Sequence, residues 1–103
     1  MTALDYTEGS DRGQTGVRPR VLLFATLDTK GREAGYVREL LTSWSVPVTL
    51  VDVGALGAPA VAADIPRERI FALAGTTADA VRKQADRGEA VTRAAEGAAQ
   101  LAR

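Results

Sequence analysis

The chain has 103 residues, which suits one domain, and its 46% apolar and 25% charged content is ordinary for a globular protein. It contains no His and no Cys, which excludes disulfides, thiolate nucleophiles and metal sites built on imidazole or sulfur. Lys plus Arg and Asp plus Glu each number 13, so no net charge favours nucleic acid or an anionic membrane as a partner.

Residues 1–19 read as an N-terminal tail. They are rich in Gly, Ser, Thr and Asp without a periodic apolar pattern, which predicts a mobile segment. They also lack the apolar stretch of a signal peptide. No apolar run anywhere reaches the roughly 20 residues that a membrane span needs. We therefore expect a cytoplasmic protein with one folded unit over residues 20–103.

The first strand is predicted at residues 21–25, where VLLFA forms a continuous apolar run typical of a strand covered on both faces. A polar turn follows, and Asp28 or Thr29 is the expected N-cap of a helix over residues 31–44. Apolar side chains at helical spacing predict that one stripe of this helix packs against a sheet. The stripe consists of Tyr36, Val37, Leu40, Leu41 and Trp44.

The second strand is predicted at residues 46–53, VPVTLVDV, which is rich in β-branched residues. Strand, helix and strand form a βαβ unit, so the two strands are expected to be parallel. Asp52 and Gly54 then follow the second strand at the edge where open α/β sheets bind ligands. An acid there commonly meets a ribose hydroxyl, and the alternative is a solvated acid that starts a turn.

The rest of the chain predicts helices. Residues 65–74 suit a short helix capped by Asp64, and the Ala-rich residues 78–103 suit a longer one that is interrupted near Gly88. The charges of Asp86, Arg87 and Glu89 could line the cleft or pair with one another, and the alternative, which we favour, is a solvated junction between helices. Two parallel strands are not expected to be stable alone. We therefore expect a third strand within residues 65–75, pairing between chains, or an incomplete domain, and favour the last.

The loop at residues 26–31, TLDTKG, is the strongest candidate site. It lies between a strand and a helix N-terminus, where backbone N–H groups and the helix dipole favour an anion. Thr29 and Lys30 would hold a phosphate, with Asp28 near a Mg2+ ion. The order of residues matches neither a Walker A loop nor G-x-G-x-x-G. The alternative is an ordinary strand-to-helix turn with its cap.

Four stretches occur in the same order as in a known family: T-L-D-T-K-G, V-D-V-G, A-x-D-I and D-R-G-E-A. Over residues 20–102 the chain thus resembles the N-terminal part of the Tm-one-like ATP-binding family, which includes a plant virus-resistance protein and bacterial relatives. The resemblance implies a Rossmann-like α/β subdomain of a longer protein that binds ATP. It does not carry over the antiviral role. The nucleotide-binding residues that it implies are Thr26, Asp28, Thr29, Lys30, Gly31, Asp52, Gly54 and Arg87.

Three functions compete. The first is a nucleotide-binding domain or subunit that takes ATP, with Mg2+ as a possible cofactor at Asp28. The second is an interaction module that pairs through an exposed sheet edge, as a homo-oligomer or with a complementary α/β subunit, and binds no nucleotide. The third is an enzyme acting on a small carboxylic or phosphorylated metabolite together with another subunit. No catalytic residue is assigned, and nucleic acid and membranes are not expected partners.

Overall fold

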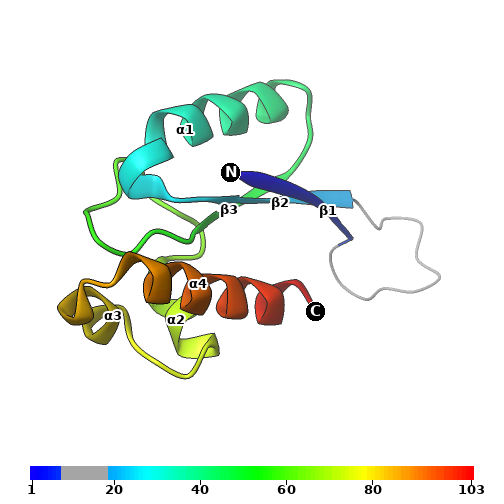
Figure 1. Ribbon diagram of the computed structural model, residues 1–103. Coiled ribbons are helices and arrows are strands. Elements are labelled where there is room, and N and C mark those ends of the chain that lie inside the picture. Colours follow the sequence, from blue (N-terminus) through cyan, green and yellow to red (C-terminus); the bar gives the residue numbers. More distant parts are fainter. Residues whose placement is uncertain (8–18) are drawn as a thin grey trace.

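The computed structural model describes residues 1–7 and 19–103. Within them the chain forms three strands and four helices, with the sheet between α1 on one side and α2 and α4 on the other (Figure 1). The α/β class expected from the sequence is confirmed. The elements in chain order are β1 (Thr2–Thr7), β2 (Pro19–Ala25), α1 (Leu27–Ser43), β3 (Val48–Asp52), α2 (Arg67–Leu73), α3 (Ala78–Gln84) and α4 (Arg87–Ala102).

The sheet is mixed, with the order β1-β2-β3. The prediction that the two strands of the βαβ unit are parallel is confirmed, because β2 and β3 pair in parallel from Val21 with Val48 to Ala25 with Asp52. The third strand is not where it was expected. Residues 2–7 of the predicted tail form β1, which pairs antiparallel with β2, whereas residues 8–18 of that tail lie outside the described residues. Ile65 contributes only an isolated parallel bridge to Val51.

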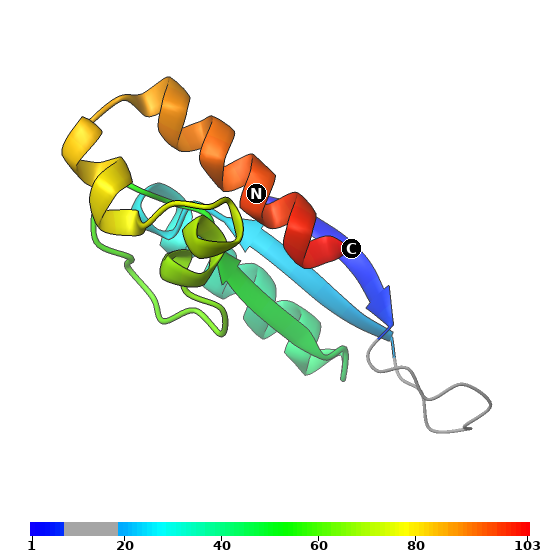
Figure 2. The same ribbon diagram turned by 90° about the horizontal axis from the view of Figure 1, so that it is seen from below.

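The two faces of the sheet bury different side chains because successive strand residues point to opposite sides. Leu23 of β2 and Leu50 of β3 belong to the core under α1. Phe24 and Val51 belong to the core on the other face, together with Ile70 of α2. Figure 2 shows α4 running along this second face. The parallel pair is therefore covered on both sides, as its continuous apolar sequence predicted.

Helix α1 differs from its prediction in its start and in its buried face. It begins at Leu27 with Thr26 as the N-cap, and a kink at Lys30 (φ −124°, ψ 23°) separates its first turn from the regular helix. Tyr36 and Trp44 of the predicted stripe are 67% and 63% exposed. Val37 of the stripe is half-buried and packs against the core, but the fully buried positions are Leu27 and small residues, which let the helix backbone approach its neighbours closely. Those small residues are Gly31, Ala34 and Gly35.

The helical C-terminal region is interrupted near Gly88, as the sequence predicted, and the break lies at Ala85, three residues before that glycine. Ala85 adopts a left-handed conformation (φ 53°) at the end of α3, and the Asp86 side chain caps α4 by accepting from the Glu89 N–H at 3.1 Å. Gly88 lies in the first turn of α4. No helix of the described part is both long and apolar enough to cross a membrane.

Candidate functional site

A cavity of about 140 Å³ opens at the edge of the sheet where the parallel strands β2 and β3 end. Three segments build it: the turn into α1, the loop after β3 and the first turns of α4. Its lining joins polar groups to an apolar wall. We call it the first cavity, and it is lined by Thr26, Asp28, Thr29, Val53, Gly54, Ala55, Leu56, Arg87, Ala90 and Val91.

The two threonines supply adjacent hydroxyl groups at the N-terminus of α1. Their Oγ1 atoms lie 2.7 Å apart, so one hydroxyl donates to the other. The Thr26 side chain makes no capping hydrogen bond to this helix, although Thr26 occupies the N-cap position, and the Leu27 N–H is bonded to Asp52 Oδ1 instead. The hydroxyls therefore lie beside a helix end whose dipole favours an anion.

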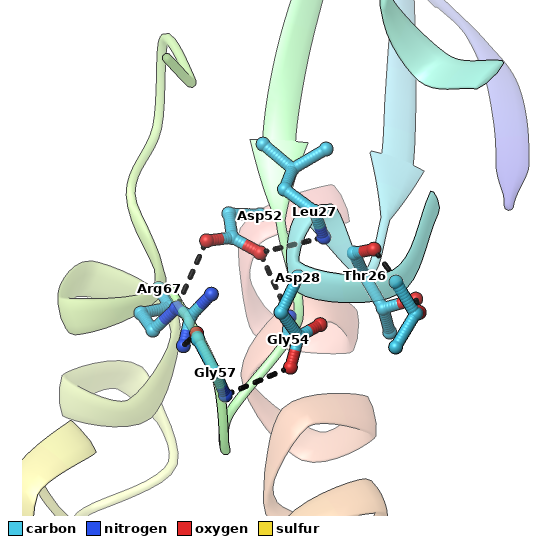
Figure 3. Close-up of polar contacts among 8 residues, drawn as sticks. Thr26, Leu27, Asp28, Asp52, Gly54, Gly57 and Arg67 are labelled. Atoms are coloured by element: carbon cyan, nitrogen blue, oxygen red, sulfur yellow. Dashed lines mark hydrogen bonds and ion pairs between the residues drawn. The ribbon is translucent and has the colours of Figure 1, made fainter. Parts of the chain in front are cut away.

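Asp28 is the acid of this site, and its two oxygens differ. Oδ2 accepts a hydrogen bond from the Gly57 N–H at 3.0 Å, whereas Oδ1 is buried without a hydrogen-bond partner (Figure 3). Gly54 lies against the same carboxylate, because a Cβ at that position would be 2.5 Å from Oδ1. Any other residue at position 54 would thus force the Asp28 carboxylate to move.

The buried carboxylate of Asp52 connects the segments that build the site. It is 2% exposed, and its Oδ1 accepts from the backbone N–H groups of Leu27 at 3.2 Å and Gly54 at 2.9 Å. Its Oδ2 is paired at 2.9 Å with the Nε of Arg67, which is 5% exposed (Figure 3). One carboxylate therefore ties the end of β3 to the starts of α1 and α2.

Arg67 is the site residue that the sequence did not reveal. Besides its pair with Asp52, its Nη1 donates to the Gly57 carbonyl, and its Nη2 is buried without a partner. From the sequence pattern alone, an Arg in the first turn of a short helix is expected to be exposed to solvent. The available signal was Pro66 directly before it, which fixes the helix start and hence the direction of the side chain.

The eight residues expected at the nucleotide site fall into two groups. Those that line the first cavity are Thr26, Asp28, Thr29, Gly54 and Arg87. The other three do not line it. Lys30 is exposed at the kink of α1, Asp52 is buried in the network above, and Gly31 faces Ala60, with an added Cβ only 2.7 Å from the Ala60 Cβ.

Arg87 brings a cation to the cavity from the far end of the chain. It is exposed, and it is the first residue of α4, which faces the turn into α1 across the loop after β3. The lining of the cavity thus contains one carboxylate, from Asp28, and one guanidinium group, from Arg87. In the part of the chain that is described, no group of three or more acidic, His or Cys residues is placed to hold a metal ion.

Comparison with known proteins gives a family but no activity. A family model described as "Uncharacterised protein family (UPF0261) N-terminal domain" matches residues 19–103. A UPF0261 protein of Clostridium tetani (strain Massachusetts / E88) is 24% identical over 82 residues, which are 80% of this chain and 20% of that protein. The chain therefore spans about a fifth of the length of this curated relative. No solved structure matches it significantly.

These matches correct the family expected from the sequence motifs. Both identify UPF0261, and neither supports the Tm-one-like ATP-binding family. The assignment from the four short motifs was wrong. Strand ends followed by Asp and Gly recur wherever a βαβ unit forms its ligand edge, so short motifs of this kind do not separate families.

Proposed function

The chain belongs to the uncharacterised protein family UPF0261, whose name states no activity, and we propose a function from the geometry of its site. The domain binds a nucleotide, with ATP as the ligand, and holds its phosphates beside the 26–31 loop. The unit formed by β2, α1 and β3 then serves as a Rossmann-like half-domain. The cytoplasmic location expected from the sequence stays a prediction.

One observation carries this proposal: the first cavity lies at the carboxyl ends of two parallel strands and at the N-terminus of α1. Open α/β sheets bind ligands at this edge, and helix N-termini favour phosphate. The hydroxyls of Thr26 and Thr29 supply donors, and the exposed guanidinium of Arg87 supplies a counter-charge. Arg87 takes the part that the sequence suggested for Lys30, because Lys30 is not in the lining.

The same cavity supports a role for Mg2+. Asp28 Oδ1 is a buried carboxylate oxygen without a hydrogen-bond partner, which suits a hard cation. Among the described residues no group of three His, Cys, Asp or Glu side chains includes Asp28, so the ion would arrive with the phosphates. Mg2+ is commonly bound in this way, through one or two carboxylates and substrate phosphates. The Mg2+ ion would lie between the Asp28 carboxylate and the phosphates and would offset the repulsion between their negative charges.

Isothermal titration calorimetry with ATP, with and without Mg2+, tests the proposal. Arg87→Ala is expected to raise the Kd by about tenfold or more, as for the loss of a charge-assisted hydrogen bond. Arg69→Ala is the matched control, because Arg69 is an exposed arginine on α2 outside the cavity. No saturable heat at millimolar ATP in a folded sample would refute nucleotide binding by this chain.

A second candidate is protein interaction, as a homo-oligomer or with a complementary α/β subunit. The observation that favours it is the exposure of Tyr36 and Trp44 on α1, since large aromatic side chains are enriched at interfaces. The sheet also has β1 as an edge strand. Size-exclusion chromatography with light scattering separates the two candidates. An association state that depends on protein concentration and does not change with ATP would favour the protein-interaction function.

A further inference from the structure

Two buried polar atoms have no hydrogen-bond partner within the described residues: Oδ1 of Asp28 and Nη2 of Arg67. Buried polar atoms are almost always paired, so each exception calls for an explanation. The two exceptions are connected. Their residues both hold the backbone of Gly57, because the Gly57 N–H donates to Asp28 Oδ2 and the Gly57 carbonyl accepts from Arg67 Nη1 (Figure 3).

Gly57 lies in a loop that is exposed from Leu56 onward, whereas Ala55 at its start is buried in the core and anchors it there. The backbone N–H of Gly54 is bonded to Asp52, and that of Ala60 is bonded to the Leu27 carbonyl at 2.9 Å. Between these anchors, the hydrogen bonds of the loop over residues 55–59 are the two made by Gly57. The bond to Asp28 is exposed and the bond to Arg67 is part-buried, and a loop fixed by so few hydrogen bonds opens at low free-energy cost.

This 55–59 loop separates two cavities. Leu56 lines the first cavity and also a second cavity of about 380 Å³, which Asp52, Gly57 and Arg67 line as well. The first cavity, at about 140 Å³, is smaller than the roughly 300–1,000 Å³ of ordinary small-molecule sites. It has room for phosphate groups but not for a whole nucleotide, whereas the second cavity falls inside that range.

We propose that the 55–59 loop is a lid, and that lifting Gly57 off Asp28 and Arg67 joins the two cavities into one cleft. The phosphates occupy the first cavity and the nucleoside occupies the second. This inference rests on the proposed nucleotide binding and names the part of the protein that recognises the nucleoside. It assigns a binding role to Arg67.

The chemistry of Arg67 suits a nucleoside better than a phosphate. Its charge is already matched by Asp52 at 2.9 Å, so its free N–H calls for a neutral acceptor. Nucleosides carry such acceptors in their ring nitrogens, carbonyl groups and ribose oxygens. Opening of the lid frees Nη1 of Arg67 and Oδ2 of Asp28, beside the unpartnered Nη2 and Oδ1, so a ligand that engages both side chains stabilises the open lid.

Nuclear magnetic resonance of the wild-type chain tests the lid, with ATP and inorganic triphosphate as paired probes, each with Mg2+. ATP is expected to shift the amide signals of Gly54 and Gly57 and the Nε–H signal of Arg67 with one common Kd. Triphosphate lacks the nucleoside and is expected to shift the Gly54 signal alone. Shifts of Gly54 by ATP without any change at Gly57 and Arg67 would overturn the lid and leave nucleotide binding standing.

If neither probe shifts the Gly54 signal, nucleotide binding itself fails, and the lid inference fails with it. Arg67→Lys adds a second measurement, because it keeps a cation beside Asp52 and removes both Nη donors, the unpartnered Nη2 and the Nη1 that is bonded to the Gly57 carbonyl. This variant is expected to weaken ATP binding about tenfold, as for one lost hydrogen bond to a charged group, and to leave the affinity for triphosphate unchanged. The exposed Arg69→Lys is the control, with both affinities unchanged. Equal weakening of both ligands by Arg67→Lys would contradict the assignment.

If Arg67→Lys does not fold, the wild-type titration decides the question alone. Hydrogen exchange of the ligand-free chain gives a readout that needs no ligand. The Gly57 amide is expected to exchange at least tenfold faster than the Asp52 amide, which is bonded to the Ile65 carbonyl at 3.0 Å beside β3. Equal protection of these two amides would show that the loop does not open independently, and would refute the lid.

Discussion

Gly97→Ala is expected to destabilise the fold, although the same change in most helix interiors has the opposite effect. Gly97 lies in α4 where this helix crosses α2. A Cβ on Gly97 would overlap the carbonyl oxygen of Ile70 and would lie 2.8 Å from both the carbonyl carbon and the Cγ2 of that residue. Non-bonded carbons settle about 3.5 Å apart or more, so the helices would have to separate.

The magnitude follows from two opposing effects. Ala in place of Gly stabilises a helix interior by about 1 kcal/mol. Overpacking costs about 1–3 kcal/mol, and we expect the upper end here because the main obstacle is backbone, which cannot rotate away as a side chain can. The net loss is about 2 kcal/mol. For a domain of this size that lowers the Tm by roughly 8–16 °C, measured by circular dichroism.

Gly88→Ala provides the matched control on the same helix. An added Cβ at Gly88 meets nothing closer than Asp86 Oδ1 at 3.4 Å, so the helix propensity is gained without a clash. We expect this variant to melt at or slightly above the temperature of the wild type. If Gly97→Ala also melts at or above the wild-type temperature, the close approach of α4 to Ile70 is not the contact that holds these helices together.

Two further predictions concern stability and exposure. Asp86→Ala removes the side-chain cap of α4 and is expected to cost about 1 kcal/mol in urea unfolding, whereas Asp79→Ala, which breaks exposed ion pairs with Arg82 and Lys83, is expected to cost less. Equal losses would argue against the cap. Trp44, the single tryptophan, is 63% exposed, so acrylamide is expected to quench its fluorescence nearly as well as that of a free tryptophan. Strong shielding would mean that another surface covers α1.

The sequence predicted those elements whose signal is local. The apolar runs of β2 and β3 and the Ala-rich α4 were found because burial on both faces or helix propensity leaves a continuous pattern. Strand β1 was missed because its six residues adjoin a polar stretch, and its stability comes from pairing with β2 rather than from its own pattern. The exposed positions of Tyr36 and Trp44 were missed because small residues form the buried face of α1.

The candidate site was predicted in its location more than in its contacts. Thr26, Thr29 and Gly54 were predicted from their positions after the two strands, and Arg87 from the charged D-R-G-E stretch, and all four line the first cavity. The partnership of Asp52 with Arg67 joins residues 15 positions apart and depends on the direction of the chain after Pro66, which no spacing rule supplies. The kink that turns Lys30 away from the cavity is likewise a backbone feature without a sequence signature.

The buried carboxylate of Asp52 also bears on how the molecule reaches its folded state. Its bonding partners lie 25 residues before it, two residues after it and 15 residues after it, so this corner completes only when distant parts of the chain have come together. Loop closure of that length is costly until the contacts that reward it exist. The corner around Asp52 thus joins parts of the chain that are far apart in the sequence. Its hydrogen bonds are complete only in a chain whose β2–α1–β3 unit has closed and whose α2 has docked, so an intact corner is a sign of a fully folded domain.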